Sequence, residues 1–278
     1  MKNSKKETID TNFIVFLGTG GARIVVAKQL RATGGMWFSI NNTNFVVDPG
    51  PGSLVRITSS KHHLDPTKLD AILLSHKHLD HSGDINIMIE AITTGGTTKH
   101  GTLFCPKDAI EGDDKVVLNY LRGFLDEIVI LTEGGKYNLN SIKFSTPVRQ
   151  HHPGDVFGFI FNTGKLKISY IVDTKYFPEL ASIYKADIMI CNVIRLKPAE
   201  LEHLSLDDVK TIIQRAKPKT AILTHFGMTI LKAKPWELAE QMTQETGIQV
   251  IAARDGMKFN LYETTLSHRG TECTEKGN

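Results

Sequence analysis

Short apolar runs separated by polar or glycine-rich stretches recur along most of the chain, and they predict its β-strands. A strand is expected where a short run of apolar or β-branched residues is bounded by turn residues such as Gly, Pro, Asn and Asp. The runs AILL and TAILT contain no charged residue, which is typical of strands buried on both faces. Strands are expected at 13–17, 37–40, 44–47, 71–74, 127–131, 136–139, 142–145, 166–172, 187–191, 220–224, 248–252 and 257–262.

Apolar residues at helical spacing lie between these strands. They predict helices at 82–92, 116–125, 206–216 and 235–246. Ser205 and Asp208 have the spacing of a capping box at the start of the third helix, and Gly247 is placed to end the fourth. Because no linker-like or low-complexity tract interrupts this alternation, we expect one α/β domain over 1–278, with a core at about 13–262 and polar ends.

The most unusual stretch follows the strand at 71–74. Within six residues the chain carries four side chains that bind metals well, His76, His78, Asp80 and His81. Neutral imidazoles and carboxylates are the ligands expected for zinc, manganese or iron. An extended turn would direct the first two side chains to one side and the last two to the other, which suits two adjacent cations better than one. The alternative is a solvated loop with chance histidines, which does not explain so close a match to a ligand set.

The order His-x-His-x-Asp-His at 76–81 resembles the signature of the metallo-β-lactamase superfamily of metallohydrolases. This resemblance implies a four-layer αββα sandwich built from two similar αβ halves, with the site in the loops at one edge. It also implies two divalent metal ions, Zn²⁺ in the first place and Mn²⁺ or Fe²⁺ as alternatives. Among the branches of the superfamily, the motifs are most similar to those of the tRNase Z and phosphodiesterase branch.

The resemblance also assigns the metal ligands. It implies one metal held by three histidines, which are here His76, His78 and His152. It implies a second metal held by one aspartate and two histidines, which are here Asp80, His81 and His225. A bridging aspartate, here Asp173, and a water or hydroxide would lie between the metals.

His152 is distinguished from its neighbour by spacing. In the branch named above, the ligand histidine precedes the glycine of a Gly-aromatic strand start by six residues, and that glycine is here Gly158. His151 is the fallback ligand. Two adjacent side chains on an extended backbone point to opposite sides, so only one of them can reach the metal.

Three polar residues are expected to support the chemistry. Asp48, at the end of a strand, would accept hydrogen bonds from the His-rich loop or a ligand histidine and fix its orientation. A turn aspartate before Pro49 is the alternative. His203 precedes the predicted helix cap and would assist the leaving group or offset transition-state charge without binding metal, the alternative being an exposed histidine. Asp80 would also steer the attacking water or accept its proton.

Two glycine-containing stretches remain. The string FLGTGGAR at 16–23 is similar to the glycine-rich loop that borders the metal site in the tRNase Z branch. Taken alone it predicts a turn between strands, because it lacks the lysine and the helix signature of a phosphate-binding loop. Asp255, in the Asp-Gly pair before the last strand, is interpreted as a turn former.

Composition and charge narrow the setting. The chain has 278 residues and a formal net charge of +3, which permits an anionic substrate but does not indicate a nucleic-acid surface. Its polar start and the lack of a long apolar run predict neither a signal peptide nor a membrane span. Cys105, Cys191 and Cys273 are widely spaced and odd in number, so no disulfide framework is expected and a cytoplasmic setting is predicted.

The function expected from these features is hydrolysis of a small nucleotide or other phosphodiester through a metal-bridging hydroxide. A tRNA substrate is not expected, because only 20 residues, 153–172, separate His152 from Asp173, where tRNase Z proteins carry their tRNA-binding arm. A thioesterase or lactonase of the glyoxalase II type is the alternative, although its third-histidine motif usually reads His-x-x-Gly. A non-catalytic metal-binding module is a second alternative, and a homodimer is left open.

Overall fold

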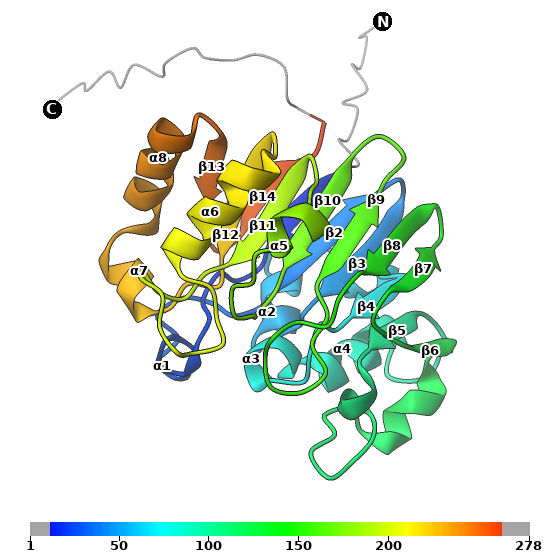
Figure 1. The fold of residues 1–278 in the computed structure, drawn as a ribbon. Coiled ribbons are helices and arrows are strands. Elements are labelled where there is room, and N and C mark those ends of the chain that lie inside the picture. Colours follow the sequence, from blue (N-terminus) through cyan, green and yellow to red (C-terminus); the bar gives the residue numbers. More distant parts are fainter. Residues whose placement is uncertain (1–11, 263–278) are drawn as a thin grey trace, which may run out of the picture.

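The computed structural model describes residues 12–262, which form two β-sheets packed face to face, with helices on both outer faces (Figure 1). Each sheet has seven strands. Three apolar clusters fill the spaces between the four layers: one lies between the sheets, and one lies under each layer of helices. The expected αββα sandwich is therefore confirmed.

The first sheet has the order β14-β1-β2-β3-β4-β5-β6, in which the pairs from β3 to β6 are parallel and the others antiparallel. Asn41 and Asn42 both have positive φ angles in the turn between β2 and β3, as a type I′ hairpin requires. The strands are β1 (Phe13–Phe16), β2 (Met36–Ile40), β3 (Thr43–Val47), β4 (Ala71–Leu73), β5 (Thr102–Cys105), β6 (Glu127–Ile130) and β14 (Met257–Asn260).

The second sheet has the order β13-β12-β11-β10-β9-β8-β7. From β8 to β13 its pairing repeats that of β1 to β6, because two antiparallel pairs are followed by three parallel pairs. This repeat agrees with the two similar halves that were expected. The strands are β7 (Gly135–Leu139), β8 (Ile142–Thr146), β9 (Phe159–Asn162), β10 (Lys167–Ile171), β11 (Ile188–Asn192), β12 (Thr220–Thr224) and β13 (Gln249–Ala252).

The helices pack their apolar faces on the outer sides of the sheets. Met88 and Ile89 of one helix pack with Ile72 of the first sheet, and Ile212 of another packs with Met189 of the second. The described helices are α1 (Arg23–Ala27), α2 (Ser53–Thr58), η1 (Pro66–Lys68), α3 (Leu79–Ser82), α4 (Ile85–Ile92), η2 (Lys107–Ala109), η3 (Asn119–Phe124), α5 (Leu180–Ile183), α6 (Leu206–Ala216), α7 (Met228–Lys232) and α8 (Pro235–Thr246), where η marks a 3₁₀ helix.

Three local predictions need correction. The helix expected at 82–92 begins only at Ile85. The end of the His-rich stretch, expected as an extended turn, instead forms the short helix α3. The helix expected at 116–125 is the 3₁₀ helix η3, because the Asn86 side chain binds the backbone of Val116 and Leu118 and holds that segment out of the helix. The glycine-rich loop leads into α1 and not directly into a strand.

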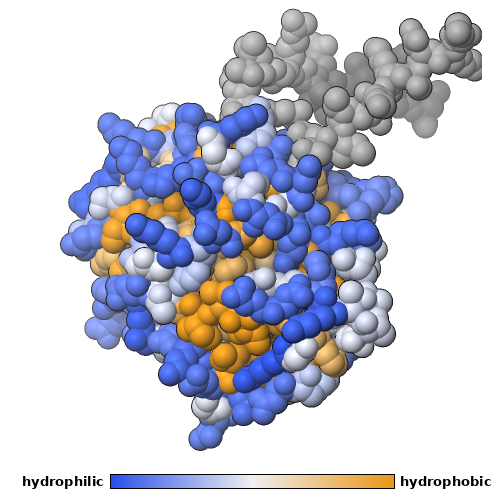
Figure 2. All heavy atoms as spheres, turned by 90° about the vertical axis from the view of Figure 1, so that its right-hand side faces the viewer, coloured by the Kyte–Doolittle hydropathy of each residue, from blue (hydrophilic) through white to orange (hydrophobic). Residues whose placement is uncertain are grey.

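Two surface properties complete the fold. Within residues 12–262, no helix is both long and apolar enough to cross a membrane. Figure 2 shows apolar side chains gathered on the side of the molecule where β6 and β7 form the sheet edges. The β6 residues Ile128, Val129 and Ile130 are only half-buried, because an edge strand has a neighbour on one side alone.

Candidate metal centre

The predicted ligands meet at the carboxyl ends of the central strands. They come from the loop after β4, from α3, from the β8–β9 connection, and from the ends of β10 and β12. Among residues 12–262, four sets of three side chains have ligand atoms within 4.8 Å of one another. These sets are His76, His78 and His152; His76, His81 and Asp173; Asp80, His81 and His225; and His152, Asp173 and His203.

The three histidines of the first set form one side of the centre. The Nδ1 atom of His78 lies 3.1 Å from the Nε2 atom of His152. The Nδ1 atom of His152 lies 2.8 Å from the backbone oxygen of Glu202 and donates to it, because a carbonyl can only accept. The Nε2 atom of His152 therefore carries the lone pair, and it points toward the other two histidines. We call His76, His78 and His152 the first triad.

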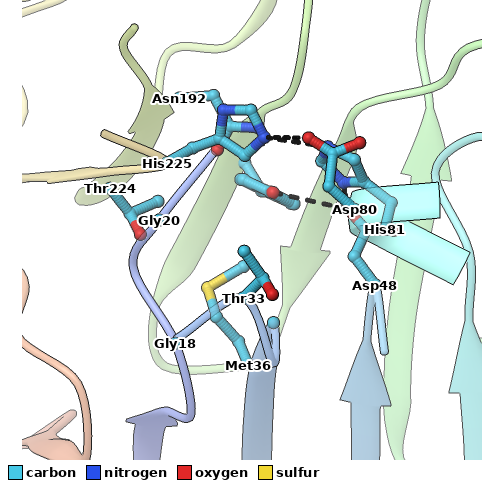
Figure 3. A pocket seen from close by; sticks show the side chains of 12 residues that line it. Gly18, Gly20, Thr33, Met36, Asp48, Asp80, His81, Asn192, Thr224 and His225 are labelled. Carbon is cyan, nitrogen blue, oxygen red and sulfur yellow. Dashed lines mark hydrogen bonds and ion pairs between the residues drawn. The ribbon is translucent and has the colours of Figure 1, made fainter. Parts of the chain in front are cut away.

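The second triad consists of Asp80, His81 and His225. The Nε2 atoms of His81 and His225 lie 3.0 Å apart, and Asp80 Oδ2 lies 3.3 Å from His225 Nε2. Figure 3 shows His225 on one side of the pocket facing Asp80 and His81 on the other. Asp80 and His81 share a helical turn, so α3 presents both side chains toward the end of β12.

Asp173 lies between the two triads, because its carboxylate is within 4.8 Å of ligand atoms of His76 and His81 and, in another set, of His152 and His203. Its Oδ2 atom is 3.5 Å from His81 Nε2 and 3.2 Å from His203 Nε2, and its Oδ1 atom is 3.5 Å from His225 Nδ1. The amide of Asn192 donates to Oδ1 at 2.9 Å and fixes the carboxylate plane. One carboxylate thus presents both of its oxygens to side chains of the centre, which is the arrangement that a bridging ligand needs.

Asp48 orients two of the histidines, one directly and one through Ser75. His81 Nδ1 donates to Asp48 Oδ2 at 3.0 Å, which leaves His81 Nε2 as the ligand atom. Ser75 donates its hydroxyl to the same carboxylate oxygen at 2.8 Å and lies 2.9 Å from His76 Nδ1. Since the Ser75 proton is committed to Asp48, His76 Nδ1 donates to Ser75, and His76 Nε2 is free to bind a metal. The contact expected between Asp48 and a ligand histidine is present.

His203 and His151 occupy different places. His203 is three-quarters buried beside Asp173, with its ring centroid 4.7 Å from that of His152. Its Nδ1 atom is buried and has no hydrogen-bond partner in the described part of the chain. His151 is exposed and packs on the ring of Phe177 at 4.5 Å, and it belongs to none of the four sets of possible ligands. The structure therefore brings His203 to the centre and turns His151 away from it.

Burial sets the protonation of the first triad. It lowers the pKa of His76 well below the ordinary histidine value, and it also lowers the pKa values of His78 and His152. A histidine with a lowered pKa is neutral at pH 7, which is the form that binds metal.

The second triad is dominated by ion pairing. Burial disfavours the charge on His81, but the carboxylates of Asp48, Asp80 and Asp173 outweigh it and raise the His81 pKa well above its ordinary value. Burial likewise opposes ionisation of Asp80 and Asp173. The neighbouring histidines reverse this effect, with His81 acting most on Asp80 and His225 on Asp173, and both carboxyl pKa values lie below the ordinary range. Both carboxylates are thus ionised at neutral pH.

This donor set fits divalent cations. Among the described residues, His76 Nε2 is fully buried and has no hydrogen-bond partner, although polar atoms in such places are normally paired. Imidazole nitrogens also face each other closely at two points of the centre. Buried lone pairs and carboxylates that converge in this way are what a metal site provides, and three to four nitrogen or oxygen ligands per ion suit zinc.

A narrow cavity of about 20 Å³ lies against the second triad. Gly18, Thr33, Met36 and Asn192 are among its lining residues (Figure 3). It has room for about one water molecule and not for a substrate group. Since His78, Asp80, His152 and His203 are the partly exposed members of the centre, a substrate has to approach on their side.

Three residues of the site escaped the sequence analysis. Ser75, Tyr170 and Asn192 are buried polar residues that contact Asp48 or Asp173, and Tyr170 donates to Asp48 Oδ2 at 3.4 Å. Ser75 could have been noticed, because it directly precedes the His-rich motif. Tyr170 and Asn192 carried no local signal, since their partners lie on other strands.

Comparison with known proteins places this centre in a family. Residues 43–226 match the family described as "Beta-lactamase superfamily domain", which is more than half of the chain. The chain therefore belongs to the metallo-β-lactamase superfamily, whose members are generally metal-dependent hydrolases. It is 35% identical over 259 residues to the uncharacterized protein MJ1374 of Methanocaldococcus jannaschii, an alignment that covers 89% of this chain and 94% of that relative.

Three solved structures share the fold at low sequence identity. The metallo-β-lactamase fold protein YhfI from Bacillus subtilis has a TM-score of 0.73 at 18% identity, covering 89% of this chain and 98% of that one. A diphosphatase from the PhnP family has a TM-score of 0.66 at 17% identity, covering 89% and 96%. The short form of human tRNase Z has a TM-score of 0.64 at 18% identity, covering 89% and 98%. At these identities the likeness shows the fold.

Proposed function

We propose that this protein is a binuclear metal-dependent phosphodiesterase that hydrolyses a small nucleotide or another small phosphodiester. The observation that carries this proposal is the position of His203. It stands outside both triads, yet its Nε2 atom lies 3.2 Å from Asp173 at the partly exposed side of the centre. A proton donor at this point suits a substrate that develops negative charge on both the leaving oxygen and the phosphoryl oxygens.

In this proposal each triad holds one cation and Asp173 contacts both. Zinc is the expected metal, with manganese or iron as alternatives, because the set contains imidazoles and carboxylates and no thiolate. Bound divalent cations would lower the pKa of a water molecule toward neutrality and offset the charge of a phosphate group.

The remaining chemistry falls to the side chains. Asp80 remains ionised and is partly exposed, so it can orient an attacking water by accepting a hydrogen bond from it. His203, when protonated, donates its proton to the leaving alkoxide. Three buried residues do not touch the substrate in this proposal and instead fix the orientation of the metal-ligand side chains: Asp48, Ser75 and Asn192.

The size of the substrate is inferred from the segment between His152 and Asp173. Residues 153–158 of this segment lead into β9, and β9, β10 and the short turn between them take up nearly all of the rest, which leaves no room for a long protruding arm. The small net charge of +3 also gives no reason to expect a large nucleic acid. A diphosphatase and a tRNase Z among the structural neighbours support phosphoester chemistry and leave the substrate open.

The test is hydrolysis of bis(p-nitrophenyl) phosphate by protein loaded with Zn²⁺ or Mn²⁺. His203→Ala is expected to lower kcat about 10²- to 10⁴-fold, the usual contribution of a positioned acid or base, while the metal content stays at the wild-type level. His151→Ala is the matched control. It removes an exposed histidine that belongs to neither triad, and its kcat should stay close to that of the wild type.

Two results would contradict the proposal. One is a wild-type protein that retains both metals but does not hydrolyse the phosphodiester. Thioesters and lactones would then be assayed, and turnover on them would favour the glyoxalase II type of activity. The other is a His203→Ala variant with full activity, which would remove the argument for a proton donor at that position.

A further inference from the structure

The turn between β13 and β14 carries Asp255, whose carboxylate holds the glycine-rich loop near the other end of the chain. Its Oδ1 atom accepts hydrogen bonds from the backbone nitrogen of Thr19 at 2.9 Å and from the Thr19 hydroxyl at 2.7 Å. Its Oδ2 atom accepts a third, from the backbone nitrogen of Ala32 at 2.9 Å. Two of these hydrogen bonds reach the glycine-rich loop, and the third holds Ala32, whose backbone oxygen accepts from Gly20 N of that loop at 2.8 Å. Together they exceed what a turn former requires, so this carboxylate fixes the loop.

The loop in turn holds the backbone around His225. The backbone oxygen of Thr19 accepts from Phe226 N at 2.7 Å, and Gly21 N donates to the backbone oxygen of Phe226 at 3.2 Å. His225 itself has a φ of +60°, in the left-handed region that residues with a side chain seldom adopt. Such a conformation persists where the surrounding structure enforces it, and here the two hydrogen bonds on its carboxyl side do so.

The loop also sets the position of the His225 ring. Gly21 lies against the imidazole so closely that a Cβ atom on this residue would be 2.1 Å from His225 Nδ1. No side chain other than hydrogen fits there, so the backbone of Gly21 packs directly against the ring and limits its position. The conformation of the loop therefore determines where His225 Nε2 points, 3.0 Å from His81 Nε2 and 3.3 Å from Asp80.

We propose that Asp255 is a positioning residue for the second triad: it fixes the glycine-rich loop, and the loop fixes His225. The proposal rests on the two-metal centre of the proposed function. Within residues 12–262, no hydrogen bond joins the glycine-rich loop to the first triad; His152 is held by Glu202 and His76 by Ser75. Loss of Asp255 should therefore weaken one metal position and spare the other.

The test separates the two positions with single-site backgrounds. His152→Gln disables the first triad and His225→Gln disables the second. Asp255→Asn is added to each, and the dissociation constant for Zn²⁺ is measured by competition with a chelator. An Asn side chain keeps one acceptor oxygen but replaces the other with an NH₂ group. That NH₂ donor would face a backbone N–H donor of Thr19 or Ala32, so at least one hydrogen bond is lost. In the His152→Gln background it should weaken Zn²⁺ binding about 10- to 100-fold, as changes behind a ligand histidine do. In the His225→Gln background it should have no effect.

Asp65→Asn is the matched control. Asp65 Oδ1 accepts the same pair of hydrogen bonds, from Thr67 N at 3.0 Å and the Thr67 hydroxyl at 2.7 Å, but in η1 and outside the centre. This variant should leave both dissociation constants unchanged. Thr19→Val removes only one of the three hydrogen bonds to Asp255. It serves as a milder variant with the same expected selectivity if Asp255→Asn does not fold.

Equal weakening of zinc binding in both backgrounds would overturn the proposal, because Asp255 would then support the fold in general. Unchanged binding in both would overturn it as well. Single-site parents that bind no zinc at all would instead contradict the metal centre and the proposed function, a result distinct from either of these.

Discussion

At the residue scale, the centre depends on buried polar side chains that never reach the substrate. Asp48 is the clearest case, since it holds His81 directly and His76 through the hydroxyl of Ser75. In each contact one imidazole nitrogen donates a hydrogen bond, which leaves the other nitrogen free to bind a metal. The ligand atom of each of these two histidines is therefore selected by a neighbour that accepts a hydrogen bond from its other ring nitrogen.

Ser75→Ala tests this dependence. The variant leaves His76 Nδ1 buried without an acceptor, so zinc binding at the first triad is expected to weaken about 10- to 100-fold. Isothermal titration of the variant with Zn²⁺ would measure the change. Ser169→Ala is the control, because the Ser169 hydroxyl is also fully buried but has no hydrogen-bond partner among residues 12–262. Zinc affinities that are equal in the two variants would show that the relay from Asp48 has no role.

The sequence predicted the residues of the centre better than their supports. His76, His78, Asp80 and His81 are recognisable because they are close together in the chain, and local order is what a single sequence displays. The contact between Tyr170 and Asp48 joins residues 122 positions apart, and no local pattern marks it. Asp255 was interpreted as a turn former for the same reason, because its partner Thr19 is 236 positions away.

At the scale of elements, short helices were the least predictable parts. The capping box of α6 was predicted correctly, and the Ser205 hydroxyl accepts from Asp208 N while the Asp208 carboxylate accepts from Ser205 N. The five-residue helix α1 has no side-chain cap and begins after Ala22, whose φ is +63°. With so little periodicity and no cap, α1 gave no signal in the sequence.

The capping box leads to a stability prediction. Ser205→Ala should lower the free energy of unfolding by about 0.5–2 kcal/mol, because it removes the side chain that caps α6. Urea unfolding would measure this as a lower midpoint with an unchanged slope. Thr211→Ala lies inside the same helix, where its hydroxyl only bonds back to Asp207 O, and it should be neutral or slightly stabilising. A midpoint unchanged by Ser205→Ala would contradict the role given to the cap.

At the scale of the whole molecule, the centre joins the two similar halves. His76, His78, Asp80 and His81 come from the first half, whereas His152, Asp173 and His225 come from the second. Each triad therefore takes ligands from both halves, and a bound cation would cross-link them. The strand order of the two sheets was expected only from the family resemblance, because strands paired in space are often distant in the sequence.

Metal removal should consequently destabilise the fold as a unit. A ligand that binds only the folded state adds about 2.7 kcal/mol at a free concentration of one hundred times its dissociation constant. The Tm of protein treated with a chelator should therefore fall, and it should recover when Zn²⁺ is added back. Scanning calorimetry with and without the chelator would show this, and an unchanged Tm would contradict the cross-linking role.

The most direct test of the account is the number of metal ions bound per chain, measured by native mass spectrometry of zinc-loaded protein. Two ions are predicted for the wild type, one each for His152→Gln and His225→Gln, and two for His151→Gln, whose side chain faces away from the centre. A single ion in the wild type, or a loss caused by His151→Gln in place of His152→Gln, would contradict the two triads on which the proposed function depends.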